Sequence, residues 1–89
     1  MEKKILVVDD EARIREIIQF NLENAGFNVD AASSAEQALE ILSEKHSLIL
    51  LDVMMPVMDG ITAAVKIRET SNVPIIFLTA KSETEDMVL

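Results

Sequence analysis

A run of apolar residues that ends in an acid and a loop constrains the fold of this chain more than any other feature. Residues 48–51 read Leu-Ile-Leu-Leu and lead directly into Asp52. A continuous apolar run bounded by turn residues is typical of a central strand that is buried on both faces. Pro56 and Gly60 follow, and they indicate that the backbone leaves the sheet in a loop. The pattern predicts a carboxylate at the carboxyl edge of a parallel strand, where open α/β sheets place their binding sites.

Three further stretches are expected to form strands, at residues 4–8, 27–31 and 75–78. The first is a continuous apolar run that leads into Asp9 and Asp10. The second alternates apolar and polar residues, which is typical of a half-buried edge strand. The third follows a proline, which is tolerated at the first residue of a strand.

Helical spacing of apolar residues separates these strands. The spacing predicts helices over 11–25, where Gly26 supplies a C-terminal stop, and over 61–67. Ser34 opens a capping-box sequence, so a further helix is expected to begin there and to end near Lys45 or His46. His46 itself, the single histidine, is expected to lie in a loop and to be neither a ligand nor a base.

Strands that alternate with helices at this spacing indicate βαβ units with right-handed crossovers. We therefore predict the α/β class with a doubly wound parallel sheet. With 89 residues the chain forms one domain, which buries roughly 60% of the surface that its unfolded form exposes.

Composition excludes several function classes. The chain contains no cysteine, which rules out a disulfide scaffold and a thiolate metal site. Its formal net charge of −8 argues against direct binding of nucleic acid by this chain. The apolar run at residues 5–8 is too short for a signal peptide or a membrane span, so the expected location is the cytoplasm, away from the membrane.

Residues with carboxylate or hydroxyl side chains, which can take part in reactions or bind ions, follow three of the predicted strands. These are the Asp9 and Asp10 pair, Asp52, and Thr79. Because the carboxyl ends of parallel strands share one edge, these side chains are expected to converge. Gathered carboxylates repel one another unless a cation neutralises them, and a hard ion such as Mg²⁺ suits oxygen ligands. A cation, a carboxylate nucleophile and a hydroxyl together point to phosphoryl transfer.

An alternative reading of the same acids needs no metal. An aspartate that follows a strand can cap the next helix, as Asp10 could for the helix at 11–25 and Asp59 for the helix at 61–67. Either reading remains open for any single aspartate; the coincidence at three strand ends favours a site.

The combined motifs resemble the receiver domain of two-component response regulators. The resemblance rests on Asp9-Asp10 after the first strand, on the stretch Asp52 to Gly60 after the third, and on Leu78-Thr79-Ala80 after the fourth. It implies a flavodoxin-like fold and a phosphoacceptor that controls a DNA-binding output in the intact parent protein. Such a domain is not an enzyme in the usual sense, since at most it catalyses its own phosphorylation and dephosphorylation.

The resemblance also implies roles for individual residues. Asp52 is similar to the aspartate that a partner histidine kinase phosphorylates, and it contributes to Mg²⁺ binding with three others. Asp10 resembles a direct ligand of the ion, Asp9 an acid that supports it through water, and Met54 the residue that offers a main-chain carbonyl.

Two residues after the fourth strand resemble the switch of the family. Thr79 is similar to the hydroxyl that moves to the phosphoryl oxygen, and Ala80 to the small residue that leaves room for that group. Family members continue with a fifth strand and a last helix, so residues 1–89 are expected to be a single receiver domain truncated before both elements.

Two other functions remain as alternatives. The chain could be a non-functional folding fragment or an engineered scaffold piece that self-associates through an exposed edge strand at 75–78, as a domain-swapped or edge-paired dimer. It could also be a phosphatase with an aspartate nucleophile. That class needs a second acid two residues after the nucleophile, where this chain has Met54.

Overall fold

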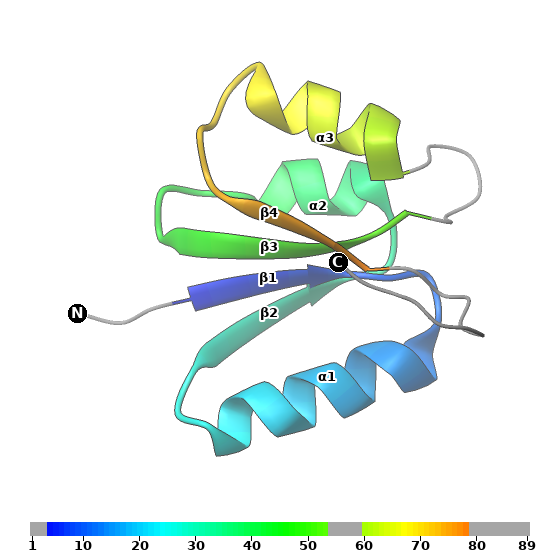
Figure 1. The fold of residues 1–89 in the computed structure, drawn as a ribbon, viewed down its shortest axis with the longest axis vertical. Helices are drawn as coiled ribbons and strands as arrows, with labels where there is room; N and C mark the ends of the chain where they lie inside the picture. Colours follow the sequence, from blue (N-terminus) through cyan, green and yellow to red (C-terminus); the bar gives the residue numbers. More distant parts are fainter. Residues whose placement is uncertain (1–3, 54–59, 79–89) are drawn as a thin grey trace.

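A computed structural model of the chain describes residues 4–53 and 60–78. Strands and helices alternate through these ranges (Figure 1). In chain order the elements are β1 (Lys4–Val8), α1 (Ala12–Asn24), β2 (Asn28–Ala32), α2 (Ala35–Ile41), β3 (His46–Asp52), α3 (Gly60–Arg68) and β4 (Ile75–Leu78). No helix in the described ranges is long and apolar enough to cross a lipid bilayer.

The four described strands form one parallel sheet with the order β2-β1-β3-β4. Ile5 of β1 lies beside Val29 of β2 on one side and beside Leu48 of β3 on the other. Figure 1 shows α1 on one face of the sheet and α2 and α3 on the opposite face. This arrangement confirms the predicted doubly wound α/β fold.

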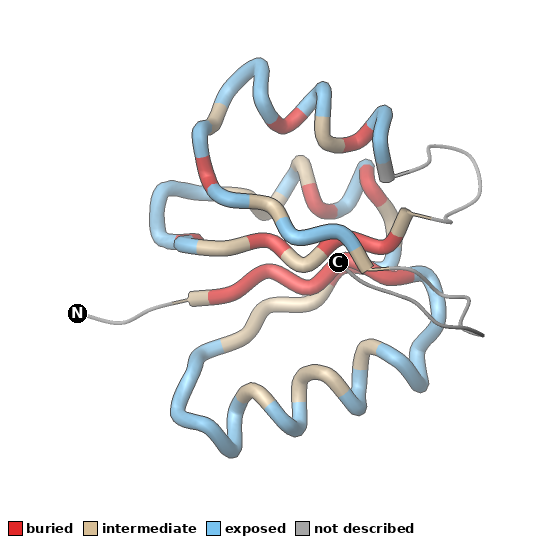
Figure 2. Tube along the Cα trace, viewed as in Figure 1, coloured by how far each residue is buried: buried red, intermediate tan, exposed pale blue. Residues whose placement is uncertain are grey.

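The hydrophobic core lies between the sheet and the pair of helices α2 and α3. Its larger members are Leu6, Val8, Ile49, Leu51 and Ile67, packed with small residues of the helices and with Val73. Alanines at the inner positions of α2 and α3 let the helices approach the sheet closely. Each fully buried leucine or isoleucine contributes about 2 to 3 kcal/mol by leaving water. The central strands β1 and β3 carry most of the buried residues (Figure 2).

The other face of the sheet is less well covered. Helix α1 packs mainly on β2 and β1, and none of its residues is fully buried. Ile14, Ile17 and Phe20 are 37%, 55% and 65% exposed. Helix α1 therefore leaves apolar side chains in contact with water.

The predicted helix ends are confirmed in two places. Gly26 has a φ of 99°, its N–H donates to the Glu23 carbonyl, and the N–H of Phe27 donates to the Leu22 carbonyl. This double pattern is the Schellman motif that a glycine permits. At α2 the Ser34 hydroxyl accepts from the Gln37 N–H at 3.1 Å, as its capping position predicts.

The predicted loop position of His46 and the predicted end of α2 were wrong. Helix α2 ends at Ile41, and His46 is the first residue of β3, where it is only 6% exposed. Its ring can be buried because both nitrogens have partners. Nε2 lies 2.8 Å from Oδ2 of Asp30, and Nδ1 accepts from the Ser43 N–H at 3.1 Å.

Candidate functional site

The register of the sheet brings two aspartates together. Val8 of β1 lies beside Leu51 of β3, so Asp9 and Asp52 are the next residues on neighbouring strands. The main-chain N–H of Asp9 donates to the carbonyl of Ala32 at 3.1 Å, which anchors the end of β1 to β2. Asp9 and Asp52 are 5% and 3% exposed, whereas the great majority of aspartates in proteins lie in contact with water.

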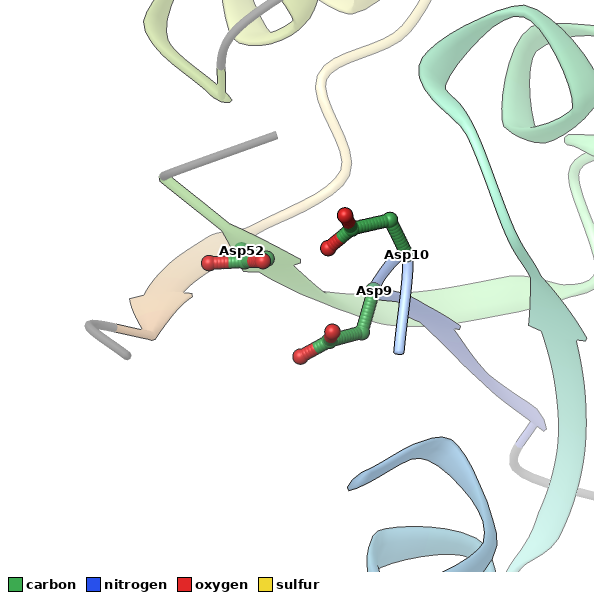
Figure 3. Close-up of side chains that lie close together, drawn as sticks. All are labelled: Asp9, Asp10 and Asp52. Atoms are coloured by element: carbon green, nitrogen blue, oxygen red, sulfur yellow. The ribbon is translucent and has the colours of Figure 1, made fainter. Parts of the chain in front are cut away.

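Asp10 completes a cluster at the carboxyl edge of the sheet. One carboxylate oxygen from each of Asp9, Asp10 and Asp52 lies within 4.8 Å of the other two. The three carboxylates extend from the ends of β1 and β3 toward the same side (Figure 3). The predicted convergence of the strand-end acids is therefore observed for these three residues.

Burial and the neighbouring negative charges disfavour the ionised form of Asp9. Burial is the main cause that raises the pKa of Asp9 above its ordinary value of 3.8, and the nearby charges of Asp52, Asp10 and Glu11 raise it further. The Glu11 N–H, which donates to Oδ1 of Asp9 at 3.0 Å, acts in the opposite direction. A positive ion among these oxygens would relieve the repulsion.

The donor set fits a hard divalent cation. All three side chains offer carboxylate oxygens, which are the ligands that Mg²⁺ and Ca²⁺ prefer, and the cluster contains no nitrogen or sulfur donor that would favour a softer metal. One side of the group, at Asp10, is exposed to solvent, which suits an ion that retains several water ligands.

The structure does not support a purely capping role for Asp10. The N-cap residue of α1 is Glu11, and no side-chain hydrogen bond caps that helix. The Glu11 N–H is instead satisfied by Asp9. The other proposed capping residue, Asp59, lies outside the described residues.

The remaining predicted site residues also lie outside the described ranges. These are Met54, Thr79 and Ala80. The described part of β4 ends beside the cluster, because Leu78 pairs with Asp52 and its carbonyl accepts from the Val53 N–H at 3.1 Å.

Sequence reasoning missed one residue at the site. Nη1 of Arg15, on α1, donates to the main-chain carbonyl of Asp9 at 2.7 Å. A basic residue in the helix that follows an acid pair was a signal that could have suggested this contact. The pattern of strand ends does not reveal this contact, because it joins a helix to the end of a strand.

Comparisons with known proteins place the chain among proteins with this architecture. A family model of the response regulator receiver domain matches residues 5–89. The transcriptional regulatory protein CpxR homolog of Haemophilus influenzae is 45% identical over 86 residues, which cover 97% of this chain and 38% of that protein. The transcriptional regulatory protein SrrA of Staphylococcus aureus is 46% identical over 89 residues, which cover 99% and 37%.

Solved structures show the same fold. Response regulator StyR superposes with a TM-score of 0.85 at 33% identity, over 99% of this chain and 46% of that chain. Response regulator TrrA of Thermotoga maritima, in complex with Mg²⁺ and BeF, gives a TM-score of 0.81 at 41% identity, over 90% and 71%.

The chain spans 37% to 38% of the length of the two curated relatives, so the comparison concerns this domain and not their whole length. The family model matches nearly all of this chain, from the first described strand to the last residue. The chain therefore belongs to the receiver domain family of response regulators.

Proposed function

We propose that the chain accepts a phosphoryl group on Asp52 from a partner histidine kinase. The observation that carries this proposal is the position of Asp52 at the carboxyl end of a central strand, beside Asp9 and Asp10. Receiver domains of response regulators are substrates of histidine kinases, and the family match supports the same relation here.

In the proposed reaction an oxygen of the Asp52 carboxylate attacks the phosphorus of a phosphohistidine. An O–P bond forms, the N–P bond breaks, and the imidazole nitrogen keeps the electron pair and takes up a proton. The product is an acyl phosphate on Asp52.

We propose that Asp9, Asp10 and Asp52 hold Mg²⁺, together with the main-chain carbonyl of Met54. The bound ion supplies positive charge that offsets the charge of the phosphoryl oxygens during transfer. The cluster geometry and the complex of TrrA with Mg²⁺ and BeF support this assignment.

We further propose that the Thr79 hydroxyl binds the phosphorylated group, that Ala80 leaves space for it, and that the change is passed to a DNA-binding output in the parent protein. The names of the two curated relatives, both transcriptional regulatory proteins, support that output. On this proposal the domain acts in the cytoplasm and catalyses at most its own phosphorylation and dephosphorylation.

The test is incubation of the chain with Mg²⁺ and acetyl phosphate, followed by intact-mass measurement. We expect a phosphate adduct in the wild type and none in Asp52→Asn. Glu36→Gln, which removes an exposed carboxylate far from the cluster in sequence, is the matched control and should retain the adduct. An adduct that persists in Asp52→Asn, or a folded wild type that takes up no phosphate, would contradict the proposal.

Self-association is a separate part of the proposal. Among the described residues β4 pairs only with β3, and its Ile76 and Phe77 are 48% and 38% exposed. Strand edges with apolar side chains favour pairing with a second chain. Sedimentation over a wide concentration range should show a dimer that Ile76→Lys weakens. Val65→Lys, on α3 and 59% exposed, is the control; a wild type that stays monomeric would contradict this part.

A further inference from the structure

Arg15 connects helix α1 to the end of strand β1 at the aspartate cluster. Its Nη1 donates to the main-chain oxygen of Asp9 at 2.7 Å, and the side chain is only partly exposed. A hydrogen bond from a guanidinium at this distance is charge-assisted and about twice as strong as one between neutral groups.

This bond completes a set of restraints on Asp9 from three directions. The Asp9 N–H donates to the carbonyl of Ala32, the last residue of β2. Its Oδ1 accepts from the N–H of Glu11, and its carbonyl accepts from Arg15. Each contact restrains a different atom. The main chain and the side chain of Asp9 are therefore both held.

The carbonyl that Arg15 holds also determines where Asp10 lies. The carbonyl of Asp9 and the nitrogen of Asp10 belong to one planar peptide group. A donor that fixes the oxygen fixes the plane, and hence the direction in which the chain enters Asp10. Asp10 is the exposed member of the cluster, and no side-chain hydrogen bond of Asp10 occurs among the described residues.

We propose that Arg15 is a positioning residue for the cation site. It orients the Asp9–Asp10 peptide so that both carboxylates face Asp52. This inference rests on the proposed function, since it concerns the same Mg²⁺ site, but it adds a residue of α1 that acts through the main chain.

If Arg15 acted only through its positive charge, it would weaken Mg²⁺ binding and not support it. A guanidinium near the cluster repels a bound cation, so its removal should strengthen Mg²⁺ binding if it acts only as a charge. If it positions the peptide, its removal should weaken binding. The sign of the change therefore separates the two roles.

The experiment compares Arg15→Met with Arg13→Met by calorimetric titration with Mg²⁺. Both variants remove one positive charge from α1, and the methionine replaces the arginine with an uncharged side chain of similar length. Arg13 is exposed, and it makes no side-chain hydrogen bond with any residue in the described part of the chain. We expect Arg15→Met to weaken Mg²⁺ binding about tenfold, as outer-shell substitutions do. Arg13→Met should leave binding unchanged or slightly tighter, and Arg15→Lys should restore part of the loss.

A second measurement needs no metal. Hydrogen exchange of the Glu11 amide, which donates to Asp9, should be faster in Arg15→Met than in Arg13→Met, while thermal unfolding shows that both variants are folded. Equal exchange in the two variants, or Mg²⁺ binding by Arg15→Met as tight as in the wild type, would overturn the inference. A wild type that binds no Mg²⁺ would refute the proposed function, and the exchange comparison would still decide the role of Arg15.

Discussion

At the scale of single residues, we expect the buried Asp9 carboxyl to lower the stability of the fold. Its carboxyl is buried beside two other acids, which raises its pKa. In Asp9→Asn the amide oxygen can still accept from Glu11, while the charge is removed. We expect this variant to be more stable than the wild type in EDTA, because burial and the neighbouring carboxylates disfavour the charged form of Asp9 in the folded state.

Urea unfolding with EDTA and with Mg²⁺ checks this prediction. Mg²⁺ should stabilise the wild type, because a ligand that binds only the folded state raises its stability. Asp9→Asn should gain less from the ion. A variant that is less stable than the wild type in EDTA would show that the Asp9 carboxylate stabilises the fold by itself.

The pKa of Asp30 is lowered in the folded state, whereas that of Asp9 is raised. The hydrogen bond with His46, and then the charge of Lys4 at 3.5 Å, hold the pKa of Asp30 below its ordinary value of 3.8. A carboxyl whose pKa is lower in the folded state contributes stability above its unfolded pKa and loses it as the pH falls through the folded pKa.

The comparison of wild type with Asp30→Asn should show this dependence. We expect the wild type to be the more stable protein near neutral pH, and the difference in unfolding free energy to shrink as the pH falls below 3.8. The effect should be small, because the Asp30 side chain is 37% exposed. A difference that does not change with pH would contradict the role assigned to the Asp30 charge.

At the scale of elements, the end of α1 depends on Gly26. Its φ of 99° is unfavourable for a residue with a side chain, although an added Cβ would meet no atom within 4 Å. Gly26→Ala should therefore destabilise the fold by about 1 kcal/mol through backbone strain alone. Thermal unfolding measures the loss, with the exposed Glu23→Ala as the control. An unchanged midpoint would show that the helix end can adopt another conformation.

Local sequence patterns predicted most of the elements because the physics behind them is local. The run before Asp52 gave a buried strand, Gly26 ended α1, and Ser34 began α2. The burial of His46 in β3 depends on its contact with Asp30, which lies on another strand. No local sequence pattern could therefore predict the position of His46. The Arg15 contact likewise joins a helix to the end of a strand.

The candidate site likewise has features that the sequence could predict and features that it could not. Three strand-end aspartates could be predicted to converge because parallel strands share an edge, and Asp9, Asp10 and Asp52 do so. Which of them would be buried was not predictable, since that depends on neighbouring elements. The roles of Met54, Thr79 and Ala80 remain predictions.

At the scale of the whole molecule, the two faces of the sheet differ in packing. Helices α2 and α3 contribute fully buried residues to the core, whereas α1 contributes none (Figure 2). We expect native-state hydrogen exchange to show α1 opening locally at low free energy, with β1 and β3 exchanging only on global unfolding. Equal protection of α1 and β1 would contradict this expectation.

The strand order has a consequence for how the chain acquires its structure during synthesis. Strand β1 emerges first, but it lies between β2 and β3, and Ile5 needs Leu48 to complete its pairing. Parallel pairing of such distant segments closes a long loop, and the entropy cost of this closure comes before the stabilising contacts form. The pairing of β1 with β3 is therefore expected to be slow. Until β3 has left the ribosome, Asp9 and Asp10 have no Asp52 beside them. The acidic cluster is thus created by the docking of β3. The proposed Mg²⁺ binding, if measured in a nascent chain, would therefore report that folding event.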